Sequence, residues 1–441
     1  MAFNLIKVLR ALAAPVAGSE LAASQGISHP TLWRAVRAAG PQIASWKEGR
    51  RLWLAATRPP GVIPVRRVAP DGEIIDLPPA RPLANGGTLW IDWRGHLRVF
   101  EGLPPEIAAL RPEGFLGRAL ARQLATIYDV ADNPNYWSDD EVLRIMSERG
   151  EDLPGDLILG EASLARWYQS SARPIPETDG LAEGFEARAR ATLAGDLPGS
   201  SAGGKQPKFT ATLQTTDGAL CSVLVKFAPR GSAPIACRLS DLLAAEAIAL
   251  AVLQKAGLPA VVPRIIDGPD RRFLVSPRYD RVAATGRQGV LPLGALDDEY
   301  FGKRRTLWTA AAARLVAARM LPPQDAARLR QADAFGALMA NTDRHYGNVS
   351  LWRPTFAGDT FRLAPLYDMA PMAYAPVGGE LRAQMAKIPI TLPGLSGVER
   401  ALVKEWALSF WADCTKSPLI SPAFQAIAAA HSAQLSESPL V

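Results

Sequence analysis

The residues of this 441-residue chain that are best suited to chemistry lie in one short segment and one position beyond it. The segment is Asn341–Asn348, in which Asp343 and Asn348 are separated by four residues, and Asp368 follows twenty residues after Asn348. An aspartate can accept the proton of an attacking hydroxyl, and an asparagine and a second aspartate supply oxygen ligands for magnesium. Enzymes that transfer phosphoryl groups commonly use such a base beside a magnesium site.

Two short strands are predicted between Asn348 and Asp368, over residues 349–353 and 361–365, with a turn at 356–359. The order of loop, hairpin and aspartate is typical of the C-terminal lobe of a kinase. The alternative is that the Asn-Thr-Asp segment is a polar surface turn, because Asp and Asn side chains often cap their own backbone. A nucleotide site upstream, in the order that a kinase requires, would favour the first interpretation.

Residues 199–205, with the sequence GSSAGGK, fit the pattern of a Walker A phosphate loop. Gln206 stands where that loop requires Ser or Thr, and Pro207 stands where its helix would begin. Residues 208–214 instead alternate with the period of a strand. A small-residue loop that leads into a strand is typical of a kinase, because its backbone amides can approach phosphate oxygens. The residues expected to contact ATP there are Ser200, Ser201, Ala202, Gly203 and Gly204.

A second strand, predicted over residues 219–227, contains Lys226, and a helix predicted over 241–257 contains Glu246. A lysine in a strand is costly to bury unless it is paired, so the helical glutamate is its expected partner. In a kinase such a lysine contacts the α- and β-phosphates of ATP. We also expect His345, inside the catalytic segment, to lie at the ATP site. Each residue alone could face solvent, but the ordered set rarely arises by chance.

The composition limits the class of protein. It is that of a globular chain, with 48% hydrophobic and 21% charged residues. No apolar run reaches the roughly 18 residues of a membrane-spanning helix, and Lys7 and Arg10 interrupt the apolar N-terminus. We therefore expect a cytoplasmic protein with no membrane partner. Three scattered cysteines and four histidines do not form a disulfide framework or a histidine-rich metal site, which leaves carboxylates and Mg²⁺.

The positive charge of the chain is concentrated at its N-terminus. Residues 1–58 contain eight basic and two acidic residues, an excess that equals the net charge of +6 for the whole chain. Such an asymmetry favours a nucleic-acid-binding segment attached to a neutral body.

The same segment predicts a helix over residues 20–25 with Ser19 as its N-cap, a turn at Gly26, and a second helix that begins after its N-cap Ser28. Residues 42–46 and 51–56 then predict a hairpin, so the pattern resembles a winged helix-turn-helix. The alternative is a small docking domain whose charges are only solvated. The residues expected to contact DNA are Thr31, Arg34, Arg37, Lys47, Arg50 and Arg51.

Together these motifs resemble the HipA family, bacterial serine/threonine kinases that are toxins of toxin–antitoxin systems. Length and the fused N-terminal domain make the chain most similar to the YjjJ-like branch. The segments that carry the resemblance are Gln206-Pro207-Lys208, Arg278-Tyr279-Asp280-Arg281, Asp343–Asn348 and Leu366-Tyr367-Asp368, and residues 111–118 resemble the signature of the N-terminal subdomain.

The resemblance implies an α+β protein with a HipA-like, bilobal, protein-kinase-like fold. A mixed N-lobe and a helical C-lobe would follow a winged helix-turn-helix domain. The expected domains are 1–58 for DNA binding, 59–140 for the HipA N-terminal subdomain, 141–280 for the N-lobe with its Ser/Gly-rich loop, and 281–441 for the C-lobe.

The resemblance also implies ATP and Mg²⁺ as cofactors. Asp343 becomes the catalytic base, Asn348 and Asp368 become metal ligands, and Lys226 pairs with the phosphates. Relatives autophosphorylate a loop serine, which ejects the loop and inactivates the enzyme. Ser201 occupies that position here, with Ser200 as the adjacent alternative, and a phosphate there would place negative charge beside ATP.

Relatives phosphorylate aminoacyl-tRNA synthetases, so the resemblance implies an aminoacyl-tRNA synthetase or another translation factor as protein substrate. They also bind DNA through a separate antitoxin, whereas here a DNA-binding segment is predicted within the chain itself. Two further functions stay open. One is a small-molecule kinase, because Asp-x-His-x-x-Asn also occurs in antibiotic and lipid kinases. The other is a DNA-binding transcription regulator with a nucleotide-sensing or inactive kinase body.

Overall fold

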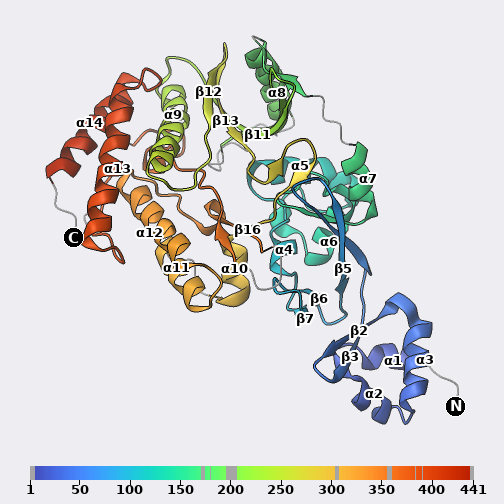
Figure 1. Ribbon diagram of the computed structural model, residues 1–441. Coiled ribbons are helices and arrows are strands. Elements are labelled where there is room, and N and C mark those ends of the chain that lie inside the picture. Colours follow the sequence, from blue (N-terminus) through green and yellow to red (C-terminus); the bar gives the residue numbers. More distant parts are fainter. Residues whose placement is uncertain are drawn as a thin grey trace. The chain divides into compact units, whose positions relative to one another are not determined.

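The computed structural model describes residues 5–169, 174–178, 180–194, 206–302, 307–354, 360–382, 384–389 and 391–437. The chain divides into two compact units (Figure 1). The first comprises residues 1–113, 120–171 and 354–359, and the second comprises residues 114–119, 172–353 and 360–441. Over the described residues, no helix has both the length and the hydropathy that crossing a bilayer requires.

Residues 5–56 form three α-helices and a three-stranded antiparallel sheet of order β1-β3-β2. The helix α3 begins after Ser28, whose side chain accepts a hydrogen bond from the backbone N–H of Thr31. The predicted apolar positions Leu21, Leu32 and Val36 are buried together. The elements are α1 (Leu5–Ala11), β1 (Val16–Ala17), α2 (Gly18–Ser24), α3 (His29–Ala39), β2 (Ile43–Glu48) and β3 (Arg51–Ala56).

The rest of the first unit contains a five-stranded antiparallel sheet of order β7-β6-β5-β4-β8. Its strands are β4 (Ile63–Val68), β5 (Ile74–Pro82), β6 (Thr88–Ile91), β7 (Leu97–Phe100) and β8 (Leu157–Leu159). Its helices are α4 (Pro105–Ala108), α5 (Gly114–Tyr128), α6 (Asp139–Arg149) and α7 (Glu161–Gln169). This unit continues past residue 140, where the sequence analysis ended the subdomain, because β8 pairs with β4 and α6 contributes Val142 and Met146 to its core.

Arg58, just after the first 56 residues, is bonded to α6 and to the turn between β5 and β6. The Nε of Arg58 donates to both carboxylate oxygens of Asp140, at 2.8 and 3.1 Å, and its Nη1 donates to the carbonyls of Leu83 and Gly87. Trp46 of β2 is buried in the same apolar cluster as Leu83. Arg58 was counted with the basic N-terminal segment, but its guanidinium is occupied by contacts within the unit.

The second unit contains a five-stranded sheet of order β12-β13-β11-β10-β9. The hairpin of β10 and β11 lies where the sequence predicts two strands, and α9 begins earlier than its predicted start at residue 241. The elements are β9 (Ile175–Pro176), α8 (Leu181–Ala194), β10 (Lys208–Gln214), β11 (Leu220–Pro229), α9 (Pro234–Lys255), β12 (Arg264–Asp267) and β13 (Arg271–Pro277).

Alternation along β11 decides which side chains face α9. Val225 and Phe227 pack in one core with Phe185 of α8, whereas Ala228 packs with Leu243 of α9. Successive side chains of a strand point to opposite faces, so Lys226 lies on the α9 side. The strand period therefore directs the one lysine of β11 toward the helix that contains Glu246.

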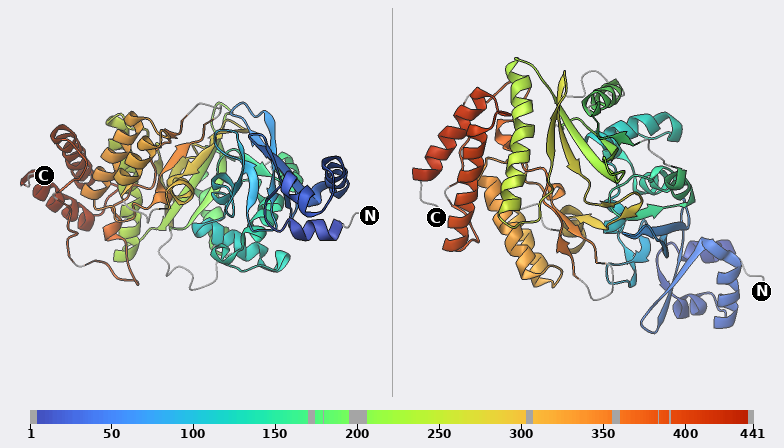
Figure 2. Two further views of the ribbon diagram at one scale, coloured as in Figure 1. Left: turned by 90° about the horizontal axis from the view of Figure 1, so that it is seen from below. Right: turned by 45° about the horizontal axis from the view of Figure 1, so that its top comes forward.

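The remainder of the second unit is mainly helical. Figures 1 and 2 show α13 and α14 side by side at one end of this unit. The pair β17–β18 is the hairpin predicted between Asn348 and Asp368, and its turn lies outside the described residues. The elements are β14 (Arg281–Val282), β15 (Gly286–Arg287), β16 (Val290–Pro292), α10 (Leu293–Tyr300), α11 (Trp308–Ala317), α12 (Pro323–Leu338), β17 (Ser350–Trp352), β18 (Arg362–Leu363), α13 (Gly397–Lys416) and α14 (Pro422–Glu437).

Replacing Arg58 by alanine tests its role as an internal contact. Arg58→Ala should lower the free energy of unfolding by about 1–3 kcal/mol, because three acceptors lose a charged donor. Urea unfolding followed by tryptophan fluorescence would measure it, since Trp46 and Trp53 lie in the apolar cluster that joins the two parts. Arg50→Ala, an exposed arginine of the preceding hairpin, is the matched control. Equal stability of the two variants would contradict this role.

Candidate active site

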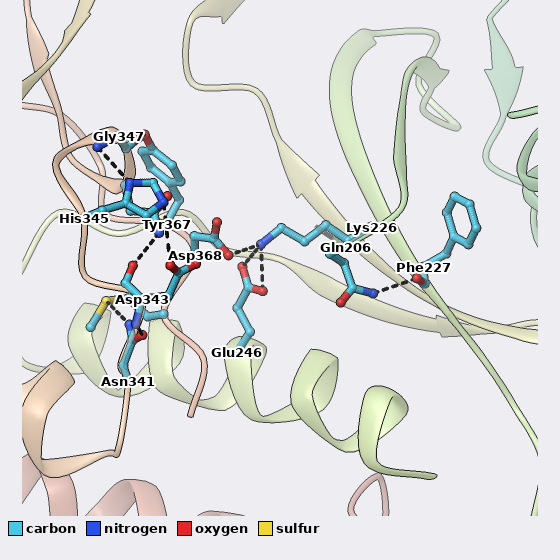
Figure 3. A network of polar contacts seen from close by, with 12 residues as sticks. Gln206, Lys226, Phe227, Glu246, Asn341, Asp343, His345, Gly347, Tyr367 and Asp368 are labelled. Atoms are coloured by element: carbon cyan, nitrogen blue, oxygen red, sulfur yellow. Dashed lines mark hydrogen bonds and ion pairs between the residues drawn. The ribbon is translucent and has the colours of Figure 1, made fainter. Parts of the chain in front are cut away.

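A buried lysine paired with two carboxylates is the main feature of the second unit. The Nζ of Lys226 donates to both oxygens of Glu246, at 2.7 and 2.8 Å, and to Oδ1 of Asp368 at 2.6 Å. Figure 3 shows Lys226 of β11 and Glu246 of α9 meeting Asp368 at one point. Lys226 and Glu246 are only 6% and 4% exposed, so almost no water competes for these contacts. The structure thus brings together three of the predicted site residues.

The charges of this cluster stabilise one another. Burial alone would raise the pKa of Asp368, but the ammonium groups of Lys226 and Lys208 outweigh burial and lower it to about 2. Burial alone would lower the pKa of Lys226, but Asp368 and Glu246 hold it above its ordinary value. Burial raises the pKa of Glu246 against the attraction of Lys226, so Asp368 is the more firmly ionised carboxylate.

Lys208 is a charged residue to which sequence reasoning gave no role. It lies directly opposite Lys226 in the β10–β11 register, and opposed residues of an antiparallel pair share a face of the sheet. Its charge helps to lower the pKa of Asp368 and opposes the rise in the pKa of Glu246 that burial causes. The position of Lys208 could have been predicted from the alternation of residues 208–214. That alternation places Lys208 on the same face of the strand as Thr210 and on the face opposite to Phe209.

The start of β10 is tied to β11 beside this cluster. The Nε2 of Gln206 donates to the carbonyl of Phe227 at 2.7 Å, and the N–H of Phe227 donates to the carbonyl of Pro207 at 3.1 Å. These bonds fix the exit of the small-residue loop. The expected ATP contacts Ser200, Ser201, Ala202, Gly203 and Gly204 lie outside the described residues.

The backbone of Asp343 is held from both sides by asparagine side chains. Its N–H donates to Oδ1 of Asn341 at 2.9 Å, and its carbonyl accepts from Nδ2 of Asn348 at 2.8 Å. Both asparagines are buried, whereas the side chain of Asp343 is 52% exposed. Nε2 of His345 lies 3.8 Å from Oδ1 of Asp343, and Nδ1 of His345 accepts the N–H of Gly347. The loop therefore presents a carboxylate to solvent on a fixed backbone.

An ion pair between half-buried Arg344 and buried Asp333 anchors this loop to the helices, and sequence reasoning missed it. The Nε of Arg344 donates to Oδ1 of Asp333 in α12 at 3.0 Å, and Nη1 of Arg344 donates to the carbonyl of Asn341. The other oxygen of Asp333 accepts from the N–H and the hydroxyl of Thr309 in α11. A Cβ at position 336 would lie 2.5 Å from Cδ of Arg344, so Gly336 leaves room for the arginine. Gly336 lies inside α12, and a glycine inside a helix was the available signal in the sequence.

The segment before Asp368 is bonded to the same loop. The hydroxyl of Tyr367 donates to the carbonyl of Gly347 at 2.7 Å, and its ring packs against Tyr279 of the Arg-Tyr-Asp-Arg run. Asp368 adopts a φ of +57°, a left-handed conformation that aspartate tolerates better than most residues. Residues of unusual backbone conformation are often found at functional sites. These contacts tie Asp368 to the loop that contains Asp343 and His345.

The oxygen atoms of Asn348 and Asp368 fit a magnesium ion. Asn348 uses its amide nitrogen on Asp343 and keeps Oδ1, while Lys226 bonds Oδ1 of Asp368 and leaves Oδ2. Within the described ranges no three His, Cys, Asp or Glu residues are placed to hold a metal. Magnesium commonly takes only one or two protein ligands and completes its shell with phosphate and water, so this sparse donor set suits it.

The residues expected to contact DNA lie on α3 and at the end of the β2–β3 hairpin. Arg34 and Arg37 are exposed on α3, and Thr31 is half-buried and accepts a bond from Arg34 at 3.3 Å. The exposed residues of the hairpin are Lys47, Arg50 and Arg51. Among the residues that the structure describes, none of these five basic side chains forms an ion pair.

Comparison with known proteins identifies the family. Residues 60–168 match the model described as the middle domain of YjjJ-like toxin, and residues 200–406 match that of the HipA-like C-terminal domain. The chain is similar to Toxin YjjJ of Escherichia coli strain K12, with 33% identity over 423 residues, covering 95% of this chain and 94% of that protein. The chain belongs to the HipA-like toxin family. Within that family it is a YjjJ-like member, so the resemblance inferred from its motifs is confirmed.

Two solved structures are similar at low sequence identity. One is HipA of the Shewanella oneidensis MR-1 toxin–antitoxin system, solved with HipB and its operator DNA, with 14% identity, a TM-score of 0.47, and coverage of 79% of this chain and 93% of HipA. The other is the proinflammatory kinase CtkA of Helicobacter pylori, with 12% identity, a TM-score of 0.36, and coverage of 56% and 93%. Neither likeness is close enough to align individual residues.

The lowered pKa of Asp368 predicts how stability depends on pH. A carboxylate whose pKa falls from its ordinary 3.8 to about 2 on folding stabilises the protein above pH 4, and that stabilisation is lost as the pH falls toward 2. The difference in unfolding free energy between the wild type and Asp368→Asn should therefore shrink between pH 4 and pH 2. Urea unfolding at a series of pH values would measure this difference. In a Lys226→Met background it should vary much less with pH, and a constant difference in the wild-type background would contradict the ion pair.

Proposed function

We propose that this chain is an ATP- and magnesium-dependent protein kinase that phosphorylates a serine or threonine hydroxyl. The observation that carries the proposal is the contact of buried Lys226 with buried Glu246 and half-buried Asp368. A buried ammonium group is costly, and the strand-lysine, helix-glutamate pair is a signature of kinase N-lobes. Family membership supports the same reading, since residues 200–406 match the HipA-like C-terminal domain.

Each residue then has a defined task. Asp343, on its fixed and exposed position, accepts the proton of the acceptor hydroxyl. Lys226 and Lys208 attract the phosphates of the nucleotide, and Glu246 keeps Lys226 in place. Asn348 and Asp368 hold magnesium, which neutralises charge on the phosphates when it is bound. His345 lies at the edge of this site and orders the loop through its bond to Gly347.

The partners and the self-modification belong to the same proposal. Autophosphorylation of Ser201, or of Ser200 beside it, would bring negative charge to the nucleotide loop and switch the enzyme off. The protein substrate would be an aminoacyl-tRNA synthetase or another translation factor, and an antitoxin would be a further partner. HipA of Shewanella oneidensis was solved together with HipB and its operator DNA. A small-molecule kinase remains the alternative for the acceptor, and assays with protein and metabolite acceptors would separate the two.

Removing the base tests the catalytic assignment. Asp343→Asn should retain nucleotide affinity and lose phosphotransfer by about 10²- to 10⁴-fold, the usual contribution of a positioned base. Transfer of radiolabelled phosphate from ATP, beside binding of a fluorescent ATP analogue, would measure both quantities. Asp132→Asn, an exposed aspartate of the first unit, is the control. Wild-type turnover by Asp343→Asn would exclude this base.

DNA binding is a second proposed activity, carried by the exposed basic side chains of residues 31–51. They lie on a helix that follows a helix and a short turn, and on a hairpin after it, an order of elements that supports the proposal of a winged helix-turn-helix. In this proposal Arg34, Arg37 and Thr31 face the major groove, while Lys47, Arg50 and Arg51 contact phosphates. A transcription regulator with an inactive or nucleotide-sensing kinase body would use the same surface, and it differs in tolerating Asp343→Asn in cells.

Removing two arginines tests the DNA surface. Arg34→Ala with Arg37→Ala should weaken duplex DNA binding and reduce the slope of log affinity against log salt by about 0.9 for each phosphate that is no longer neutralised. Fluorescence anisotropy with labelled duplex DNA at several salt concentrations would measure the slope. Arg190→Ala with Lys255→Ala, two exposed basic residues of the second unit, is the control. Unchanged affinity and slope in the α3 variant would show that α3 does not bind DNA.

A further inference from the structure

We propose that Lys226 is the internal counter-ion of Asp368 in the nucleotide-free protein, so that a divalent metal binds this site firmly only together with nucleotide. The inference rests on the proposed kinase function and concerns how the two ligands depend on each other. Its basis is the 2.6 Å contact between Nζ of Lys226 and Oδ1 of Asp368, an atom of the carboxylate assigned to the metal.

Within the group of Lys226, Lys208, Glu246 and Asp368 the formal charges cancel without any ligand. Lys226 and Lys208 contribute two positive charges on one face of the sheet, and Glu246 and Asp368 contribute two negative charges. A divalent cation that approached Asp368 alone would meet the ammonium of Lys226 at short range. Lys226 is buried and Asp368 is half-buried, so their charges are screened less than those of exposed groups, and the repulsion offsets part of the attraction to the carboxylate.

A nucleotide changes this balance because its phosphates carry several negative charges. Lys226 has a flexible four-carbon stem, and its ammonium can turn toward a phosphate while Glu246 continues to hold it. That movement exposes Oδ1 of Asp368 to the metal. Since coupling between two bound ligands is reciprocal, the metal must strengthen nucleotide binding by the same factor.

The alternative is that the contact between Lys226 and Asp368 persists when metal is bound, through the carboxylate oxygen that Lys226 does not use. The two cases make opposite predictions for a protein without the ammonium group. If Lys226 competes with metal, its removal strengthens metal binding in the absence of nucleotide. If it does not compete, its removal leaves metal binding unchanged or weaker.

Manganese ion is a suitable probe, because electron paramagnetic resonance reports its free concentration during titration. Without nucleotide, Lys226→Met should bind Mn²⁺ more tightly than the wild type, on the order of tenfold, equivalent to about 1.4 kcal/mol.

Lys226→Met leaves Glu246 buried without a partner and could unfold the N-lobe. The double variant Lys226→Met with Glu246→Gln removes the unpaired carboxylate and should show the same increase in Mn²⁺ affinity. Adding Asp368→Asn to either variant should abolish it.

Binding of a fluorescent ATP analogue with and without Mn²⁺ completes the experiment. The wild type should show strong mutual enhancement, and the Lys226 variants should show less. If wild type binds nucleotide but neither folded Lys226 variant binds Mn²⁺ more tightly, the counter-ion is disproved and the kinase proposal stands. If the wild type binds no nucleotide with Mn²⁺ present, the kinase proposal fails and the coupling fails with it.

Discussion

The second unit is organised around one ammonium group that is buried between two carboxylates. Because a buried lysine is stable only when it is paired, the positions of Lys226, Glu246 and Asp368 constrain one another. This single contact joins a strand, a helix and a segment 142 positions further along the chain. In the proposed function a nucleotide would contact the same ammonium group that stabilises the fold, so folding and the proposed chemistry depend on one set of charges.

The backbone of Asp343 is held in place by contacts with its neighbours in the loop and by the attachment of the loop to α12. Two asparagine side chains hold its N–H and its carbonyl, and the ion pair of Arg344 with Asp333 attaches the loop to α12. A general base must be held in position while its carboxylate stays available to accept a proton. The exposed carboxylate of Asp343, on a backbone with little freedom, meets that requirement.

Much of this arrangement could be predicted from sequence, because strand alternation and the spacing of Asp343, Asn348 and Asp368 are local patterns. The hairpin with Lys226 and the helix with Glu246 were found in this way. Pairings between distant segments leave no local pattern, so the Arg344–Asp333 ion pair was missed. For the same reason Arg58 was counted with the surface charges, and the subdomain was ended at residue 140, before the strand β8 that completes its sheet.

The most direct test of the central claim is phosphate mapping by mass spectrometry after the purified protein is incubated with ATP and Mg²⁺, beside Asp343→Asn. The account predicts phosphate on the small-residue loop, at Ser201 or Ser200, in the wild type and none there in the variant. Equal phosphorylation of both proteins would contradict Asp343 as the base. A wild-type protein that carries no phosphate, and binds no nucleotide, would contradict the assignment of the Lys226 cluster as a kinase site.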